Sequence, residues 1–122
     1  MNPADLFARQ TDDTITLAPG EVLFREGDEG HCMYVLLEGS LEISVNAKVV
    51  ENSARGAIVG EMALIENTPR TATVTAKDTA RLVKIDQRRF HFLVQQNTFF
   101  ASHVMKVLAE RLNHMNKLVS QG

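Results

Sequence analysis

Short runs of β-forming residues, separated by turn-forming residues, fill the chain up to Asp86 and constrain its fold more than any other feature. Each run is rich in β-branched residues or alternates apolar with polar side chains, as strands do. The turn formers between the runs tolerate proline-fixed or left-handed backbone angles. The expected strands cover residues 14–17, 22–24, 33–37, 41–45, 48–50, 57–59, 71–76 and 80–85. Short strands in this number, joined by such turns, indicate a mainly β fold, either a jelly-roll or a barrel.

Helical patterns flank these strands. Asn2 is a suitable N-cap and Pro3 suits a first helical position, so a short N-terminal helix is expected. After Asp86, another suitable N-cap, apolar residues recur at three- and four-residue steps, which is the helical period. A second C-terminal helix can start at Asn97. The sequence therefore predicts helices on both sides of the β region.

The last predicted helix carries a heptad-like seam of apolar residues. They follow one another at alternating steps of four and three residues: Ala101, Met105, Leu108, Leu112, Met115 and Val119. The seam is shorter than the roughly 3–4 heptads that indicate a coiled coil, so packing of a monomer's helix on its own β region is the favoured interpretation. The alternative is a weak homodimer through this C-terminal helix.

Length and charge restrict the class of protein. The chain has 122 residues and is expected to be one domain, 1–122, with an N-terminal helical segment (1–12), a β region (13–86) and C-terminal helices (87–119). No apolar run approaches the roughly 18 residues of a membrane-spanning helix, and no signal-peptide pattern opens the sequence. The single Cys32 cannot form an internal disulfide, which agrees with a cytoplasmic protein. A net charge of −2 gives no general reason to bind nucleic acid.

Residues 60–74 carry the strongest functional signal. Gly60 lacks a Cβ and lets the backbone approach a ligand, while residues 61–64 read as one helical turn whose N–H groups attract anions. Arg70 follows Pro69, and its fixed fork of donors suits two phosphate oxygens. Glu61 only accepts hydrogen bonds when ionised and suits a sugar hydroxyl. The stretch therefore predicts a site for a small sugar phosphate; the alternative is an ion pair between Glu61 and Arg70 that only pins the loop.

The same stretch resembles the phosphate-binding cassette, residues 57–72 here, of the cyclic nucleotide-binding domain family, found in protein kinase A regulatory subunits, cyclic-nucleotide-gated channels and catabolite activator proteins. Residues 19–28 and 33–39 resemble the glycine-punctuated first half of that fold, and residues 90–112 resemble its closing helices. One departure is Val59, where the family usually carries phenylalanine. The resemblance implies a stand-alone domain: an eight-stranded β-jelly-roll (double-stranded β-helix) with a short N-terminal helix, a short cassette helix and two C-terminal helices. Whether the chain is a natural stand-alone protein or a fragment stays open.

The resemblance also implies how a ligand is held. Arg70 would pair with the cyclic phosphate, Glu61 would accept the ribose 2′-hydroxyl, and the backbone amides of Gly60, Glu61, Met62 and Ala63 would bind the remaining phosphate oxygen. The C-terminal helices would close over the base, with Asn97 as a hinge. Candidate base or lid contacts are Val59, Arg111, Leu112 and Met115.

Thr71 bears on which base is preferred. In the family a threonine at this position often accompanies cGMP, although other members with threonine or serine bind cAMP, and cAMP is the favoured ligand here. Strand alternation would send Arg70 and Thr71 to opposite faces, so both reach one ligand only if the strand is irregular at its start.

Other functions find less support in the sequence. Metal-dependent cupin enzymes share the jelly-roll shape but need clustered histidines, and those of this chain are scattered: His31, His91, His103 and His114. Adjacent strand residues such as His31 and Cys32 point to opposite faces and cannot form a nucleophile–base pair, so no catalysis, metal or cofactor beyond the cyclic nucleotide is expected. Met33 and Tyr34 read as core residues.

Two further expectations concern partners. Catabolite activators carry a helix-turn-helix after the long helix, for which these 122 residues leave no room, so neither nucleic acid nor membrane is an expected partner. The second functional hypothesis is a protein-interaction module of the same fold without ligand control. A protein effector is a candidate partner in either case.

Overall fold

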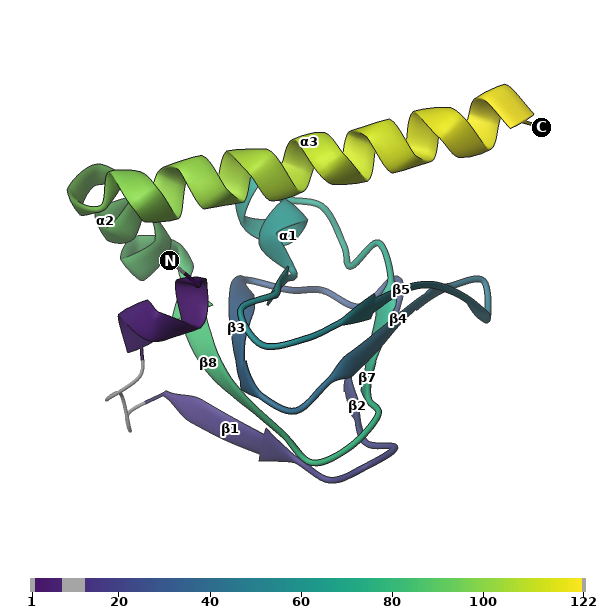
Figure 1. Cartoon of the computed structure of the whole chain (residues 1–122), viewed down its shortest axis with the longest axis horizontal. Helices are drawn as coiled ribbons and strands as arrows, with labels where there is room; N and C mark the ends of the chain where they lie inside the picture. Colours follow the sequence, from purple (N-terminus) through teal and green to yellow (C-terminus); the bar gives the residue numbers. More distant parts are fainter. Residues whose placement is uncertain (1, 8–12, 122) are drawn as a thin grey trace. The chain divides into compact units, whose positions relative to one another are not determined.

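In the described part of the chain, eight antiparallel β-strands form two four-stranded sheets (Figure 1). The computed structural model describes residues 2–7 and 13–121, with side chains of the last helix as far as His114. The strands are β1 (Thr14–Leu17), β2 (Val22–Phe24), β3 (Cys32–Glu38), β4 (Leu41–Val45), β5 (Lys48–Ser53), β6 (Ile58–Val59), β7 (Thr73–Ala76) and β8 (Ala80–Asp86). One sheet has the order β1-β8-β3-β6 and the other β2-β7-β4-β5. The predicted jelly-roll is confirmed.

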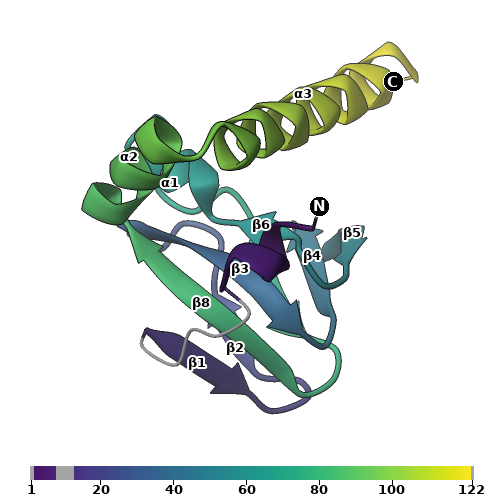
Figure 2. The ribbon, with the colours of Figure 1, turned by 60° about the vertical axis from the view of Figure 1, so that its left-hand side comes forward.

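The hydrophobic core of the jelly-roll is built by residues of both sheets. Leu36 of β3 and Leu82 of β8 come from the sheet in which β8 runs between β1 and β3 (Figure 2). Leu41 of β4 and Val74 of β7 come from the other sheet, and all four side chains are at most 1% exposed. Burying an aliphatic side chain of this size stabilises a fold by roughly 1.5–3 kcal/mol, so the two sheets form a firm frame for the loops between them.

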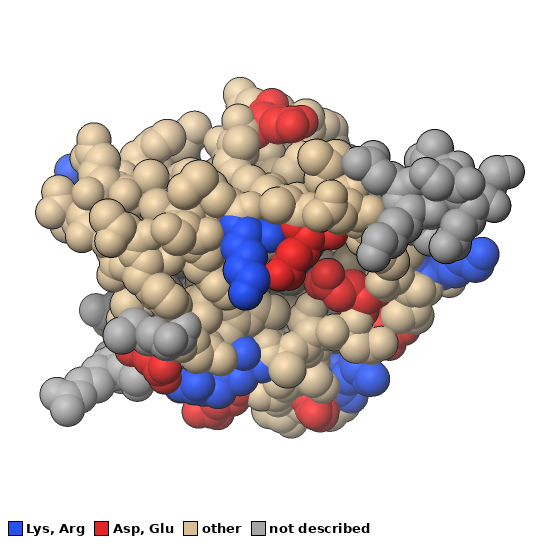
Figure 3. Space-filling view, turned by 45° about the horizontal axis from the view of Figure 1, so that its top comes forward, with Lys and Arg blue, Asp and Glu red and all other residues tan. Residues whose placement is uncertain are grey.

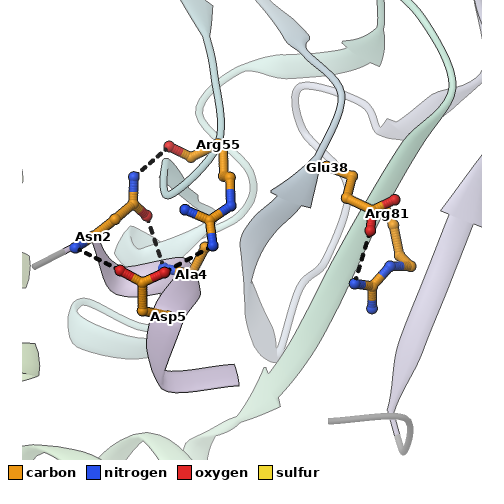
Figure 4. A network of polar contacts seen from close by, with 6 residues as sticks. All are labelled: Asn2, Ala4, Asp5, Glu38, Arg55 and Arg81. Carbon is orange, nitrogen blue, oxygen red and sulfur yellow. Dashed lines mark hydrogen bonds and ion pairs between the residues drawn. The ribbon is translucent and has the colours of Figure 1, made fainter. Parts of the chain in front are cut away.

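The predicted N-terminal helix is the 3-10 helix η1 (Pro3–Phe7), and it is tied to the segment that enters β6. Asn2 acts as the predicted cap, because its Oδ1 accepts a hydrogen bond of 2.9 Å from the N–H of Ala4. Its side-chain Nδ2 donates to the carbonyl of Arg55 at 3.0 Å, and the Arg55 guanidinium pairs with Asp5 at 2.8 Å (Figure 4). These contacts fix the turn that leads into β6.

The chain divides into two compact units, residues 1–87 and 88–122, of which the second is helical. It contains most of α2 (Gln87–Gln96) and all of α3 (Thr98–Gln121). Asn97 lies between them and caps α3, since its Oδ1 accepts the N–H of Phe100 at 2.9 Å. The rings of Phe90 and Phe100 meet edge to face with centroids 6.1 Å apart, which joins the two helices. None of the described helices is long and apolar enough to span a membrane.

Two strands, β5 and β7, differ from their predicted limits by more than one residue. β5 continues past Val50 to Ser53 because its backbone pairs with β4, and an edge strand of a sheet tolerates polar side chains. β7 begins at Thr73, two residues later than expected. The backbone of Arg70, just before it, is instead bonded to the loop that follows β2.

Candidate functional site

The backbone of Arg70 is held by the loop between β2 and β3. The N–H of Arg70 donates to the carbonyl of Asp28 at 2.8 Å, and the carbonyl of Arg70 accepts from the N–H of Gly27 at 2.8 Å. This pair of bonds places the arginine beside the loop before the regular strand β7 begins. The side chain of Arg70 therefore starts from a fixed point of the frame.

The guanidinium of Arg70 is buried, and three neutral groups of the described residues contact it. The residue is 6% exposed; its Nη1 donates to the carbonyl of Gly60 at 3.2 Å, and its Nη2 lies 3.7 Å from the Sγ of Cys32. The guanidinium carbon lies 4.1 Å from the centroid of the Phe24 ring. Within the described residues, the Nε of Arg70 has no hydrogen-bond partner. A buried cation with such partners favours the approach of an anion.

Glu61 opens the short helix α1 (Glu61–Ile65) and is 1% exposed. Gly60 precedes it in a left-handed conformation with φ 81°, which glycine adopts without strain. The N–H of Ala63 donates to the carbonyl of Gly60 at 3.3 Å. The carbonyl of Gly60 therefore accepts hydrogen bonds both from this amide and from Nη1 of Arg70. These two bonds connect the turn at Gly60 to the arginine side chain.

Two glycines leave the space that the arginine occupies. A Cβ on Gly60 would come within 2.5 Å of Nη1 of Arg70, and a Cβ on Gly30 would collide with its Nε and Cζ. The sequence predicts that Gly60 lets the backbone approach a ligand closely. The structure adds that the missing Cβ of Gly60 also makes room for the Arg70 side chain. Gly30 was not among the predicted site residues.

Three more residues around the arginine are not among the predicted site residues. Phe24 is the last residue of β2, while Cys32 and Tyr34 lie two apart on β3 and share a face of that strand. The Sγ of Cys32 donates to the hydroxyl of Tyr34 at 3.3 Å, and the rings of Tyr34 and Phe24 have centroids 6.3 Å apart. Burial, and next the bond with Cys32, raise the pKa of the Tyr34 hydroxyl above its usual range. The one sequence signal was the alternation that places Cys32 and Tyr34 on one face.

The remaining predicted contacts are distributed over both units. Thr71 is exposed and lies before β7 begins, outside the regular strand, so strand alternation does not force Arg70 and Thr71 to opposite faces. Val59 is 2% exposed and packs in the core, and Met62 is half-buried on α1. In the second unit Arg111 is half-buried and Leu112 is 59% exposed, while the side chain of Met115 lies outside the described residues. Their roles stay predictions.

Neither the charges on the face shown in Figure 3 nor the metal-ligand patterns of the described residues give another site of this kind. On the face shown in Figure 3, Lys and Arg side chains are interspersed with Asp and Glu side chains, unlike the basic surfaces that bind nucleic acid. Within residues 2–7 and 13–121, no group of three or more His, Cys, Asp or Glu side chains is arranged to hold a metal ion.

The two sheets, the short helix α1 and the buried arginine beside it define the class: a jelly-roll domain with a cassette for an anionic ligand. Residues 14–97 match the family model described as cyclic nucleotide-binding domain. The chain belongs to the cyclic nucleotide-binding domain family, whose domains are typically regulatory and not catalytic.

Curated relatives share this domain within longer proteins. Rap guanine nucleotide exchange factor 1 of Caenorhabditis elegans is 36% identical over 78 residues, which are 63% of this chain and 8% of that protein. The Pycsar effector protein XpPycTIR of Xanthomonas perforans is 33% identical over 102 residues, which are 83% of this chain and 34% of that protein. The chain thus spans only a minor part of either relative.

Solved structures include ligand-bound relatives of similar fold. The cAMP-bound PfPKA-R superimposes with a TM-score of 0.73 at 27% identity, over 86% of this chain and 36% of that one. The cAMP-bound form of the EAL enzyme Bd1971 gives a TM-score of 0.64 at 30% identity, over 84% and 29%. The catabolite activator protein of Thermus thermophilus, at 18% identity, gives a TM-score of 0.79 over 94% and 61% and shows the fold alone.

Proposed function

We propose that the chain binds a cyclic nucleotide, with Arg70 on the cyclic phosphate and Glu61 on the ribose 2′-hydroxyl. The observation that carries the proposal is the guanidinium of Arg70, which is 6% exposed and lies, within the described part of the chain, against the carbonyl of Gly60, the Sγ of Cys32 and the ring of Phe24, all neutral groups. Keeping a cation out of water is costly unless an opposite charge compensates for it. A phosphate supplies that charge, and two of its oxygens match the arginine fork.

The backbone around Gly60 supports the same ligand class. The left-handed glycine leads directly into α1, so the amides of Gly60, Glu61 and Met62 follow one another around a tight turn. These amides are the proposed donors to the remaining phosphate oxygen. The amide of Ala63 donates to the carbonyl of Gly60, so it would take part only by sharing its hydrogen atom.

Between the two common cyclic nucleotides, cAMP is the proposed ligand. PfPKA-R, at 27% identity, is known with cAMP bound, which supports this choice. Bd1971, however, is known in cAMP-bound and cGMP-bound forms, so the fold accepts either base. Thr71 could add one hydrogen bond to guanine, worth about 0.5–1.5 kcal/mol, which is at most roughly tenfold in affinity.

Calorimetric titration of the chain with cAMP and with cGMP tests the proposal. We expect saturable binding of both nucleotides, with cAMP the tighter. Adenosine, which lacks the phosphate, is the matched control ligand and should bind far more weakly, because Arg70 then has no anion to pair with. Absence of binding heat and of any thermal stabilisation with either cyclic nucleotide would contradict the function.

As a cytoplasmic sensor, the domain would report binding through its C-terminal helices. Asn97, which caps α3 and separates it from α2, is the proposed hinge, and Arg111, Leu112 and Met115 are the proposed lid contacts. Hydrogen exchange measures this directly. We expect the amides of residues 98–118 to exchange more slowly at saturating cAMP, and unchanged exchange there would contradict the switch while leaving ligand binding intact.

A ligand-independent interaction module is the second candidate, and the exposed seam of α3 favours it. Met105 is 62% exposed and Leu112 is 59% exposed, one heptad apart on the same helix face. A second copy of the chain is the proposed occupant, because the heptad spacing is self-complementary. Light scattering should then show a concentration-dependent dimer that Leu112→Lys weakens and Asn113→Lys does not; a monomer at all concentrations would contradict it.

A further inference from the structure

The arginine of the cassette is buried, yet few hydrogen bonds fix its orientation. The bond from Nη1 to the carbonyl of Gly60 is 3.2 Å long, and the contact from Nη2 to Cys32 is 3.7 Å. Ordinary N–H···O bonds are about 2.9–3.0 Å long and a thiol sulfur is a weak acceptor, so both contacts restrain the side chain weakly. Within the described residues, its Nε has no partner at all. Something other than hydrogen bonding must hold the guanidinium in place.

The ring of Phe24 can restrain the guanidinium of Arg70 through a cation–π contact. It lies 4.1 Å from the guanidinium carbon, well inside the roughly 6 Å limit of a cation–π contact. The backbone of Phe24 pairs with Val74 of β7, which is 1% exposed, and its ring packs against the core and beside Tyr34. The ring is therefore anchored in the frame and can act as a fixed platform.

The space around the guanidinium is closed by glycines as well. Gly30 and Gly60 both border it so closely that a Cβ at either position would collide with the guanidinium group. A planar side chain stacked on a fixed ring, with backbone at its margins, has little freedom to turn. Its plane is then set mainly by the ring.

We infer that Phe24 is a positioning residue, which holds the guanidinium of Arg70 in the plane and place where it receives the phosphate of the ligand. The inference rests on the proposed function of Arg70. It assigns to Phe24 a role beyond filling the core, since an aliphatic side chain of similar size would keep the packing and lose the aromatic face. The chemistry requires an aromatic ring at this position and a guanidinium opposite it.

Three variants of the chain separate this role from packing. Phe24→Leu keeps an apolar side chain and should weaken cAMP binding in calorimetry by roughly 5- to 30-fold, the range expected for losing a partly buried cation–π contact. Phe24→Tyr keeps the ring and should restore affinity to within about twofold. Phe92→Leu, the same substitution at a 60% exposed position on α2, is the matched control and should leave affinity unchanged.

A double-mutant cycle with Arg70 decides how Phe24 acts. In the Arg70→Leu background, Phe24→Leu should have no further effect on the residual cAMP affinity, because the guanidinium that it positions is gone. An equal loss in both backgrounds would mean that Phe24 acts through packing alone and would overturn the inference. So would wild-type affinity in Phe24→Leu.

The wild-type titration keeps this inference distinct from the proposed function. If the unmodified chain binds neither cyclic nucleotide, the function fails. If it binds cAMP, and Arg70→Leu weakens binding while Phe24→Leu does not, the function stands and only the role of Phe24 fails.

Discussion

Gly30 lies so close to Arg70 that a Cβ at this glycine would collide with the Nε and Cζ atoms of the guanidinium. The two residues are far apart in sequence, and the loop between β2 and β3 brings them together through the backbone bonds of Arg70 to Gly27 and Asp28. The arginine that is proposed to bind phosphate therefore depends on the space that is left because Gly30 has no Cβ.

The first prediction is that Gly30→Ala weakens cAMP binding by roughly tenfold, because the guanidinium must move out of the space that the methyl group takes. Calorimetry measures the loss. Gly20→Ala is the control: Gly20 has φ 86° and open space around it, so alanine there should lower the melting temperature and leave affinity unchanged. Wild-type affinity for cAMP in Gly30→Ala would contradict the prediction, because the Arg70 side chain could then make room for the methyl group without losing its contact with the ligand.

The second prediction concerns the charge itself. Arg70→Leu should lower the affinity for cAMP by roughly 10- to 150-fold, because it removes a charge-assisted contact worth about 1.5–3 kcal/mol. The affinity of Arg70→Lys for cAMP should lie between that of the wild-type chain and that of Arg70→Leu. Lysine keeps the positive charge but loses the planar fork of donors and the stacking on Phe24. Titration of the three proteins checks the order, and a lysine variant as weak as the leucine variant would argue against a role for charge.

Features of the fold and site that depend on interactions between residues close in sequence could be predicted from the sequence. Strand patterns and turn residues are local, so β1, β2 and β4 have the predicted limits and the jelly-roll is correct. The cassette is also local, because Gly60 and Glu61 are adjacent and Arg70 follows closely on the same loop. These three residues can therefore be identified as site candidates without knowledge of the fold.

The surroundings of Arg70 could not be predicted in the same way. Phe24, Gly30 and Cys32 reach the guanidinium only because β2, its loop and β3 pass beside it, which is a property of the register between distant strands. Strand alternation correctly treats Tyr34 as part of an apolar strand, yet it does not reveal that its hydroxyl meets Cys32. The late start of β7 has the same origin, since backbone bonds to a distant loop decide it.

The third prediction tests the proposed contact of Glu61 with the ribose. Glu61→Ala should weaken cAMP binding by about 10-fold or more, because a carboxylate acceptor is worth about 1.5–3 kcal/mol. The same variant should bind 2′-deoxy-cAMP nearly as well as the wild-type chain does, since that analogue lacks the hydroxyl. Calorimetry with both ligands gives the comparison, and equal losses for the two would indicate a purely structural Glu61.

The fourth prediction concerns acid stability and the pair that anchors η1. The hydrogen bond from Arg55, and next that from the amide of Asn2, hold the pKa of Asp5 below its usual value of 3.8. A carboxyl whose pKa is lower in the folded state stabilises the fold above the unfolded pKa, and this contribution disappears as pH falls through the folded pKa. Asp5→Asn should therefore lower the melting temperature at pH 7, with the difference vanishing in strong acid.

Melting curves between pH 7 and about pH 2 measure this difference. It should be small, because both side chains are about half exposed, and it should shrink at high salt. In an Arg55→Met background, Asp5→Asn should retain only the smaller contribution of the Asn2 amide. A difference that persists unchanged in acid would assign the effect to something other than the carboxylate.

The fifth prediction addresses the choice of base. Thr71 is exposed and precedes the regular part of β7. We propose that its hydroxyl meets the base while Arg70 holds the phosphate. Thr71→Ala should lower cGMP affinity by at most about tenfold and leave cAMP affinity nearly unchanged, because the proposed donor to this hydroxyl is the 2-amino group of guanine, which adenine lacks. Thr71→Ser, which keeps the hydroxyl, is the matched control and should retain cGMP binding. Equal losses for both nucleotides would place Thr71 against the shared sugar phosphate instead of the base.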